Sequence, residues 1–228
     1  MNKYIGLIVA TKEELEEVEK IMVDIKKKNI YNLEFLEGEI NNNNYVVVQC
    51  GVGKVNAART AQVLIDNYNV KYVINAGVAG GISNKVQIGD IVIGKELVQH
   101  DFDITAFGHP KGYISDTGRS FISNDELVKK CKSVTIENIN IIVGNIASGD
   151  IFCTDIKMKE KIKEKFNCDC VEMEGAAIAQ VCFLSNIPFV VIRAISDVLN
   201  GENQKDYEEF VHFAAKNCAK FIEQLGKL

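Results

Sequence analysis

Carboxylates near the ends of three expected elements could carry acid–base chemistry. Glu13 and Glu14 follow a short apolar run, Glu172 and Glu174 precede an apolar helix, and Asp197 follows the apolar stretch 189–195. Hydrolysis at an anomeric carbon needs an acid for the leaving group and a carboxylate that activates water. Each carboxylate alone also fits a structural role, at the positive end of a helix or as a turn cap. Together they predict a hydrolytic site.

Glycine, histidine and cysteine patterns are weaker signals. Gly51-x-Gly53 has Asn56 where a dinucleotide fingerprint has its third glycine, and Val55 after Gly53-Lys54 excludes a Walker loop. We therefore interpret this stretch as a tight strand-to-helix turn. The three histidines lack metal-ligand spacing, and the close pair Cys168 and Cys170 has no second cluster. We expect neither a metal nor a cofactor.

The composition predicts an ordered chain of one domain covering residues 1–228. Its 228 residues are 47% hydrophobic and 25% charged, enough to bury a sizeable core. A net charge of −5 lacks the basic footprint of nucleic-acid binding. We expect no membrane segment, because no apolar run approaches about 18 residues, and no signal peptide. Seven cysteines, an odd number, suit reduced thiols and a cytoplasmic location.

Apolar runs alternate with amphipathic stretches along the whole chain. Short apolar runs predict strands, and apolar residues at helical spacing predict helices. Thr11 and Glu14 form a capping box at the start of the first helix. The expected strands cover residues 5–10, 33–38, 45–49, 72–75, 89–98, 139–147 and 189–195, and the expected helices cover 12–27, 54–68, 155–165, 174–185 and 206–225. The strands at 33–38 and 45–49 flank a polar turn at 41–44 and predict a hairpin.

This alternation predicts a single α/β domain, a mixed and mainly parallel sheet flanked by helices. In such sheets, ligands bind beyond the carboxyl ends of the strands. That rule selects four places, at residues 11–14, 77–81, 149–153 and 196–197. They are far apart in the sequence, and we expect them to converge in space.

Five motifs follow one another between residues 74 and 198. They are Ile74-Asn75-Ala76-Gly77-Val78-Ala79-Gly80-Gly81, His100-Asp101-x-Asp103-x-Thr105-Ala106-Phe107-Gly108, Ser148-Gly149-Asp150-x-Phe152, Val171-Glu172-Met173-Glu174-x-x-Ala177-Ile178-Ala179 and Arg193-Ala194-Ile195-Ser196-Asp197-Val198. Each alone is a weak signal, but the ordered set resembles the 5′-methylthioadenosine/S-adenosylhomocysteine nucleosidases. The resemblance implies a nucleoside phosphorylase-like fold, a homodimer, and hydrolysis of the N-glycosidic bond that releases adenine and the 5′-thioribose.

The resemblance implies a catalytic role for two carboxylates. Asp197 would protonate adenine N7 with Ser196 orienting it, and Glu14 would activate water with Arg193 close by. Adenine is a poor anionic leaving group, so Asp197 must hold or share a proton, which requires a raised pKa. The apolar strand before Asp197 suits such a dry setting. The nearby Arg193 would keep Glu14 anionic.

The resemblance also implies a set of substrate contacts. Glu174 and the Met173 backbone would bind the ribose hydroxyls, Phe152 would stack on adenine, and the Cys153 backbone would pair with the purine edge. Further implied contacts are Val78, Glu172 and an aromatic lid residue, Tyr207. The partner subunit would contribute Phe107 and His109 to the 5′-thio pocket.

Some positions depart from the choices common in that family. Val78 stands where serine is usual and Thr11 where methionine is common, and Cys153, His109 and Ser115 also differ. Valine removes one hydroxyl hydrogen bond, worth about 1 kcal/mol. These departures bear on turnover rate and on the preferred 5′ substituent more than on the reaction class.

Four alternatives stay open at this stage. A phosphorylase would need arginine or backbone amides to bind phosphate, but the chain has only three arginines. In addition, the loop directly after its first strand carries two glutamates, which would repel phosphate. A silent nucleoside binder would have no need for all of Glu14, Glu174 and Asp197. Futalosine-type nucleosides and 5′-deoxyadenosine are further possible substrates. The apolar segment 107–121 is either a dimer interface or a surface flap.

Overall fold

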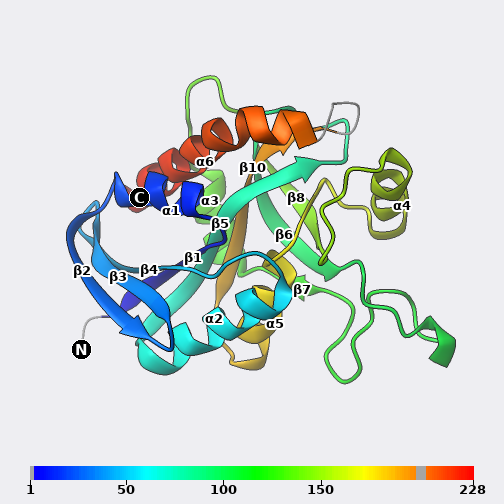
Figure 1. Ribbon diagram of the computed structural model, residues 1–228, viewed down its shortest axis with the longest axis horizontal. Coiled ribbons are helices and arrows are strands. Elements are labelled where there is room, and N and C mark those ends of the chain that lie inside the picture. The colour runs from blue at the N-terminus through cyan, green and yellow to red at the C-terminus, as the bar shows by residue number, and fades with distance from the viewer. Residues whose placement is uncertain (1–2, 199–203) are drawn as a thin grey trace.

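A computed structural model describes residues 3–198 and 204–228, and Figure 1 shows its elements in order. These are β1 (Tyr4–Val9), α1 (Lys12–Glu19), β2 (Val23–Ile30), β3 (Leu33–Ile40), β4 (Asn43–Gln49), α2 (Lys54–Asn67), β5 (Val70–Gly81), β6 (Ile91–Gln99), η1 (Thr105–Phe107), β7 (Phe121–Ile122), α3 (Asp125–Lys132), β8 (Ile141–Ser148), α4 (Ile156–Phe166), β9 (Cys170–Glu172), α5 (Gly175–Leu184), β10 (Phe189–Asp197) and α6 (Gln204–Gly226).

One mixed sheet organises the described residues. Its order is β10-β6-β8-β9-β5-β1-β4-β3-β2, with β7 against β6, and β10 also pairs with β5. Five of the strands therefore pair in a closed ring, in the order β5, β10, β6, β8 and β9. The ladders β1–β4, β1–β5, β5–β10, β6–β8 and β8–β9 are parallel, and the other five are antiparallel. The mixed sheet is confirmed, and its two longest ladders, β5–β10 and β6–β8, are parallel.

Helices cover both faces of this sheet, and each face has its own core. On one face, Leu64 of α2 and Ile178 of α5 pack with Val73 and Val191. On the other face, Val18 of α1, Cys131 of α3 and Phe221 of α6 pack in a second core. Figure 1 shows α1, α3 and α6 together on one side of the sheet and α2 with α5 on the opposite side. The expected α/β architecture is confirmed.

The helix expected over residues 12–27 is wrong in its second half. Helix α1 begins with the predicted capping box at Thr11 and ends at Glu19. Residues 23–30 form β2, an antiparallel partner of β3 at the edge of the sheet. Helical spacing of a few apolar residues was outweighed by non-local strand pairing. Lysines 26, 27 and 28 lie on this exposed strand, where charge discourages pairing with another chain.

The predicted hairpin is confirmed, and its strands are longer than expected. β3 and β4 pair from Ile40 with Asn43 to Phe35 with Val48. The two residues between them, Asn41 and Asn42, both have positive φ, of 48° and 60°. Two-residue hairpin turns need positive φ at both central positions, which asparagine tolerates better than most residues.

Two strands extend further than predicted, and both extensions matter for the site. β5 runs through the glycine motif to Gly81, and β10 runs to Asp197, because these ends pair with one another and with β9. Four elements were not predicted from the sequence, namely β7, β9, η1 and α3. Helix α3 had a readable start signal, since the Asn124 side chain accepts from the N–H groups of Glu126 and Leu127.

None of the helices in the described part of the chain has a stretch long and apolar enough to cross a membrane.

Candidate active site

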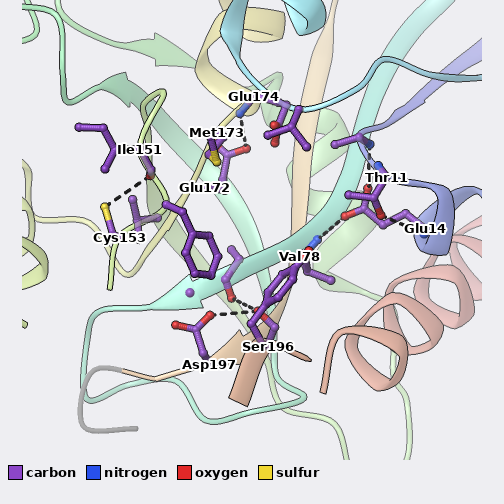
Figure 2. Close-up of a pocket in the computed structure, with 17 residues that line it drawn as sticks. Thr11, Glu14, Val78, Ile151, Cys153, Glu172, Met173, Glu174, Ser196 and Asp197 are labelled. Atoms are coloured by element: carbon purple, nitrogen blue, oxygen red, sulfur yellow. Dashed lines mark hydrogen bonds between the residues drawn. The ribbon is translucent and has the colours of Figure 1, made fainter. Parts of the chain in front are cut away.

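The four places selected by the strand-end rule converge on one cavity of about 310 Å³. Figure 2 shows its walls, with Glu14 and Asp197 on opposite sides and Glu172, Met173 and Glu174 along a third. The lining residues are Ala10, Thr11, Glu14, Val52, Val78, Ala79, Gly80, Ile151, Phe152, Cys153, Val171, Glu172, Met173, Glu174, Ser196, Asp197 and Tyr207. The volume suits a small organic ligand.

Glu14 serves the helix and the cavity at once. As the third helical residue of α1 it closes the capping box with Thr11. Its Oε2 accepts from the N–H groups of Ala10 at 2.7 Å and Thr11 at 3.0 Å, and its Oε1 from Val78 at 2.9 Å. Burial raises the pKa of Glu14 above its ordinary value, although the Arg193 charge and these N–H groups oppose the rise. A carboxylate with a raised pKa is a better base.

The glycines of β5 let the carboxylates of Glu14 and Asp197 approach the strand. A Cβ on Gly77 would lie 2.5 Å from Glu14 Oε1, and a Cβ on Gly80 would lie 2.9 Å from Asp197 Oδ2. Both distances are shorter than van der Waals contact, so any larger residue would displace the carboxylate. The motif at 77–81 therefore makes room for side chains from two other elements, rather than forming a loop around a ligand.

Asp197 lies at the end of β10 and is only 3% exposed. Its Oδ1 lies 3.1 Å from the hydroxyl oxygen of Ser196, which in turn lies 3.3 Å from the carbonyl oxygen of Ala79. Its Oδ2 accepts from Lys159 Nζ at 2.7 Å. The dry setting expected for this acid is confirmed. The lysine partner was not foreseen.

Arg193 lies behind the cavity and pairs with Glu172 rather than with Glu14. Its guanidinium donates to Glu172 Oε2 and to the side-chain oxygen of Asn75, all three side chains being buried. Glu172 also accepts from the Ser148 hydroxyl and from the N–H groups of Glu174 and Gly175. Its carboxylate is thus fully engaged inside the protein, which favours a positioning role for it.

The pKa values of Glu172 and Glu174 are shifted in opposite directions. Burial is the largest influence on Glu172 and raises its pKa, but Arg193 and the hydrogen bonds outweigh it and leave the pKa below the ordinary value. At Glu174, burial and then the Glu172 charge raise the pKa to about 7, against the charge of Arg193 and the N–H of Gly53. Glu174 therefore titrates near neutral pH and is available to a ligand.

Two aromatic rings line the cavity together. Phe152 and Tyr207 meet edge to face, with ring centroids 5.3 Å apart and planes at 76°. Phe152 is 45% exposed, so one side of the ring is free for a planar ligand. Burial, followed by the charge of Glu14, raises the pKa of the Tyr207 phenol to about 12. The tyrosine is accordingly neutral at ordinary pH.

Phe107 and His109 lie outside this cavity in the same chain. They belong to the segment between β6 and β7, the green chain that reaches away from the body at the lower right of Figure 1. Phe107 is 81% exposed, and the His109 ring stacks on Tyr113 with centroids 4.5 Å apart. A role for these residues in the pocket would require a second copy of the chain.

Some site residues escaped the sequence analysis. Lys159 lies in the strongly charged segment 156–166, where nothing in the local pattern distinguishes it from its neighbours. Asn75 was quoted only as part of a motif, although its buried position on β5 after an apolar run was a readable signal. Gly51 and Gly53 form the expected tight turn, both with positive φ. Within the described residues, no cluster of His, Cys, Asp or Glu could hold a metal ion.

The fold and the site define a member of the phosphorylase superfamily, whose family model matches residues 4–227. A 5′-methylthioadenosine/S-adenosylhomocysteine nucleosidase of Staphylococcus haemolyticus is 37% identical over 226 residues, which cover 98% of this chain and 99% of the relative. The chain belongs to this nucleosidase family.

Two solved structures show the same fold. The nucleosidase of Colwellia psychrerythraea in complex with adenine has a TM-score of 0.95 at 36% identity, covering 100% of this chain and 96% of the other. A futalosine hydrolase of Helicobacter pylori has a TM-score of 0.93 at 32% identity, covering 98% and 97%. Similar scaffolds therefore serve more than one nucleoside.

The Arg193–Glu172 pair generates a prediction on stability. Replacing Arg193 by methionine leaves the Glu172 carboxylate buried without its cation, and we expect a loss of about 3–5 kcal/mol in the free energy of unfolding. Urea unfolding followed by circular dichroism measures this loss. The control is Lys71→Met at an exposed position, with an expected change within about 0.5 kcal/mol. Equal stability of the two variants would contradict this account of the core.

Proposed function

We propose that this protein hydrolyses the N-glycosidic bond of 5′-methylthioadenosine and S-adenosylhomocysteine, releasing adenine and the 5′-thioribose. The observation that carries the proposal is the placement of Glu14 and Asp197 on opposite sides of a nucleoside-sized cavity. Family membership supports the substrate class. We expect no cofactor, because acid-assisted departure of adenine and attack by water need only proton transfers.

The purine end of the proposed site is formed by Phe152, Cys153 and Asp197. The free face of Phe152 stacks on adenine, and the Cys153 backbone pairs with the purine edge. Asp197 delivers a proton to N7, so that adenine departs as a neutral molecule while the ribose becomes oxocarbenium-like. Ser196, 3.1 Å from Asp197 Oδ1, orients the carboxyl group. The same carboxyl can accept from the exocyclic amine, which favours adenine over other purines.

The sugar end is formed by Glu14, Glu174 and the backbone of Met173. Glu174 and Met173 bind the ribose hydroxyls and fix the sugar between acid and base. Glu14 takes a proton from the attacking water, as its raised pKa favours. Val78 contributes its N–H to Glu14 and an apolar side chain to the sugar. Arg193 and Glu172 act from behind by fixing the turn that carries Glu174.

Water rather than phosphate is the proposed nucleophile. The lining residues include Glu14, Glu172, Glu174 and Asp197 but no lysine or arginine within the described part of the chain. Arg193 is engaged by Glu172, and Lys159 is paired with Asp197. A dianionic phosphate would meet carboxylates without a free cation, which is strongly unfavourable.

A homodimer completes the proposed 5′ pocket. Two apolar side chains that line the cavity are exposed, Val52 at 52% and Ile151 at 41%. Outside the cavity, Val55 and Phe107 are more exposed still. Exposed apolar groups of this kind mark interaction surfaces. We propose that Phe107 and His109 of a second copy cover the mouth and contact the 5′ substituent.

We also propose that residues 1–228 act as one nucleosidase domain in the cytoplasm. The family model extends over residues 4–227 without interruption. All seven cysteines lie among the described residues, and each is buried and free of a disulfide. Burial raises the pKa of these thiols, so that they stay protonated and unreactive. Such thiols suit a reducing compartment.

The first test is adenine release from 5′-methylthioadenosine in phosphate-free buffer, measured by chromatography. We expect release without phosphate, together with free methylthioribose. Asp197→Asn and Glu14→Gln should each lose at least about 100-fold in kcat, because each removes a proton-transfer group. Binding of a non-cleavable C-nucleoside analogue should persist in Asp197→Asn. Release only after phosphate addition would mean a phosphorylase, and release only from a futalosine-type nucleoside would redefine the substrate.

The titration of Glu174 generates a prediction on pH dependence. Its pKa of about 7 means that protonation replaces the carboxylate as pH falls through neutrality, and the neutral form is the weaker acceptor for ribose hydroxyls. At one pH unit below the pKa, only about a tenth of the Glu174 side chains are ionised. The Kd of a C-nucleoside analogue should therefore rise roughly tenfold between pH 8 and pH 6. Glu174→Gln should bind weakly and independently of pH. A flat Kd for the unaltered protein would refute this role.

The proposed shared pocket generates a prediction on assembly. Sedimentation of the active protein should show a dimer. Phe107→Ser should raise KM for 5′-methylthioadenosine, because it removes an apolar contact from the partner's site. The control is Ile122→Ser. Ile122 is also apolar and is 56% exposed, but it lies outside the segment 107–121. A fully active monomer would rule out the shared site.

A further inference from the structure

One lysine is buried beside the proposed acid. Lys159 lies in the first turn of α4 and is 0% exposed, the only lysine so buried among the residues whose side chains are described. The helix carries other lysines, and neighbouring Lys161 is exposed. A buried ammonium is costly unless it is paired. Lys159 meets this requirement by donating from Nζ to Asp197 Oδ2 at 2.7 Å.

The position of this lysine matters because the reaction consumes a proton at Asp197. A hydrogen bond joins the ammonium of Lys159 directly to the carboxyl group of Asp197, so a proton can pass from Nζ to Oδ2 along it. Asp197 Oδ1 faces the Ser196 hydroxyl and Oδ2 faces Lys159. Asp197 also lines the cavity, so its carboxyl group connects the lysine with the space that a purine would occupy.

We propose that Lys159 is a positioning residue that stores the proton which Asp197 passes to N7 of the purine. This inference rests on the proposed function. In the resting pair the ammonium holds the proton and Asp197 is a carboxylate. When the purine binds, the proton moves from Nζ through the carboxyl group to N7, and Lys159 becomes a neutral amine.

The proton balance of the cycle closes. The Nζ–H bond breaks and the N7–H bond forms, and the electrons of the C1′–N9 bond leave with adenine. Water forms a bond to C1′, and one of its protons goes to Glu14. The protein then holds a neutral Lys159 and a protonated Glu14. Exchange with solvent moves one proton from Glu14 to Lys159 and restores the resting state.

Other titratable groups around the pair do not compete for this proton. Cys153, on the loop before α4, has a pKa raised to about 11, mainly by burial. Tyr207 on α6 has a pKa raised to about 12, also mainly by burial. Both stay neutral over the working range. On β5, Gly80 lies against Asp197 and has no side chain that could titrate. Glu14 and Glu174 are the remaining ionisable groups of the cavity without a cationic partner of their own.

Two variants separate proton storage from simple charge pairing. Lys159→Arg keeps the positive charge, but a guanidinium does not give up its proton. We expect it to lose at least about 100-fold in kcat for adenine release, the usual scale of general acid catalysis. Lys159→Met leaves Asp197 to carry the proton alone. This variant should remain active at low pH. The pH at which its kcat falls on the basic side of the profile should be at least about one unit lower than in the unaltered protein.

A second substrate distinguishes chemistry from structure. The 4-nitrophenyl 5-methylthioriboside has a leaving group that departs as a stable anion and needs no proton. Release of nitrophenolate should therefore stay within about threefold of normal in both variants, since only the barrier to protonation has changed. Lys161→Arg and Lys161→Met, on the same helix and exposed, are matched controls that should leave both reactions unchanged.

Each remaining outcome decides the matter. Near-normal adenine release by Lys159→Arg, or equal losses on both substrates, would overturn the inference in favour of an electrostatic or structural role. Should the arginine variant fail to fold by circular dichroism, the methionine variant decides, and an unshifted basic limb would overturn it. Absence of adenine release from the unaltered protein would instead refute the proposed function.

Discussion

The buried ion pair between Arg193 and Glu172 is the constraint on which the site depends. Two charges inside a protein are tolerated only when every lone pair and proton finds a partner. Asn75, Ser148 and backbone N–H groups supply those partners, and they come from β5, β8 and the start of α5. The pair thus links β10 and β9 to β5 and β8. It also holds the turn that presents Met173 and Glu174 to the cavity.

The same dry interior gives four carboxylates different chemical characters. Arg193 and the hydrogen bonds hold the pKa of Glu172 below its ordinary value, whereas burial raises the pKa of Glu14 against the Arg193 charge and the backbone N–H groups. Glu174 feels the negative charge of Glu172 and titrates near neutrality. Asp197 faces an ammonium instead. Enzymes separate acids from bases through such differences of environment. A proposed acid and a proposed base can therefore coexist in a cavity of modest size.

Small residues on β5 allow these groups to meet. Gly77 and Gly80 lie on a paired strand, where glycine normally weakens the sheet. Here each replaces a side chain that would collide with Glu14 or Asp197. The weakening is offset by long ladders to β1 and β10 on either side. The strand is consequently both the centre of the fold and the floor of the site.

The sequence by itself determined the fold class, the capping box at Thr11, the family and most of the residues that line the cavity. These follow from local periodicity, local hydrogen bonding and ordered motifs, which a linear chain displays directly. Tertiary structure decided that residues 23–30 form a strand, that Arg193 pairs with Glu172, and that Lys159 meets Asp197. Lys159 and Asp197 are 38 positions apart on different elements. Such contacts depend on packing between distant segments, so no local pattern specifies which charges share a buried space.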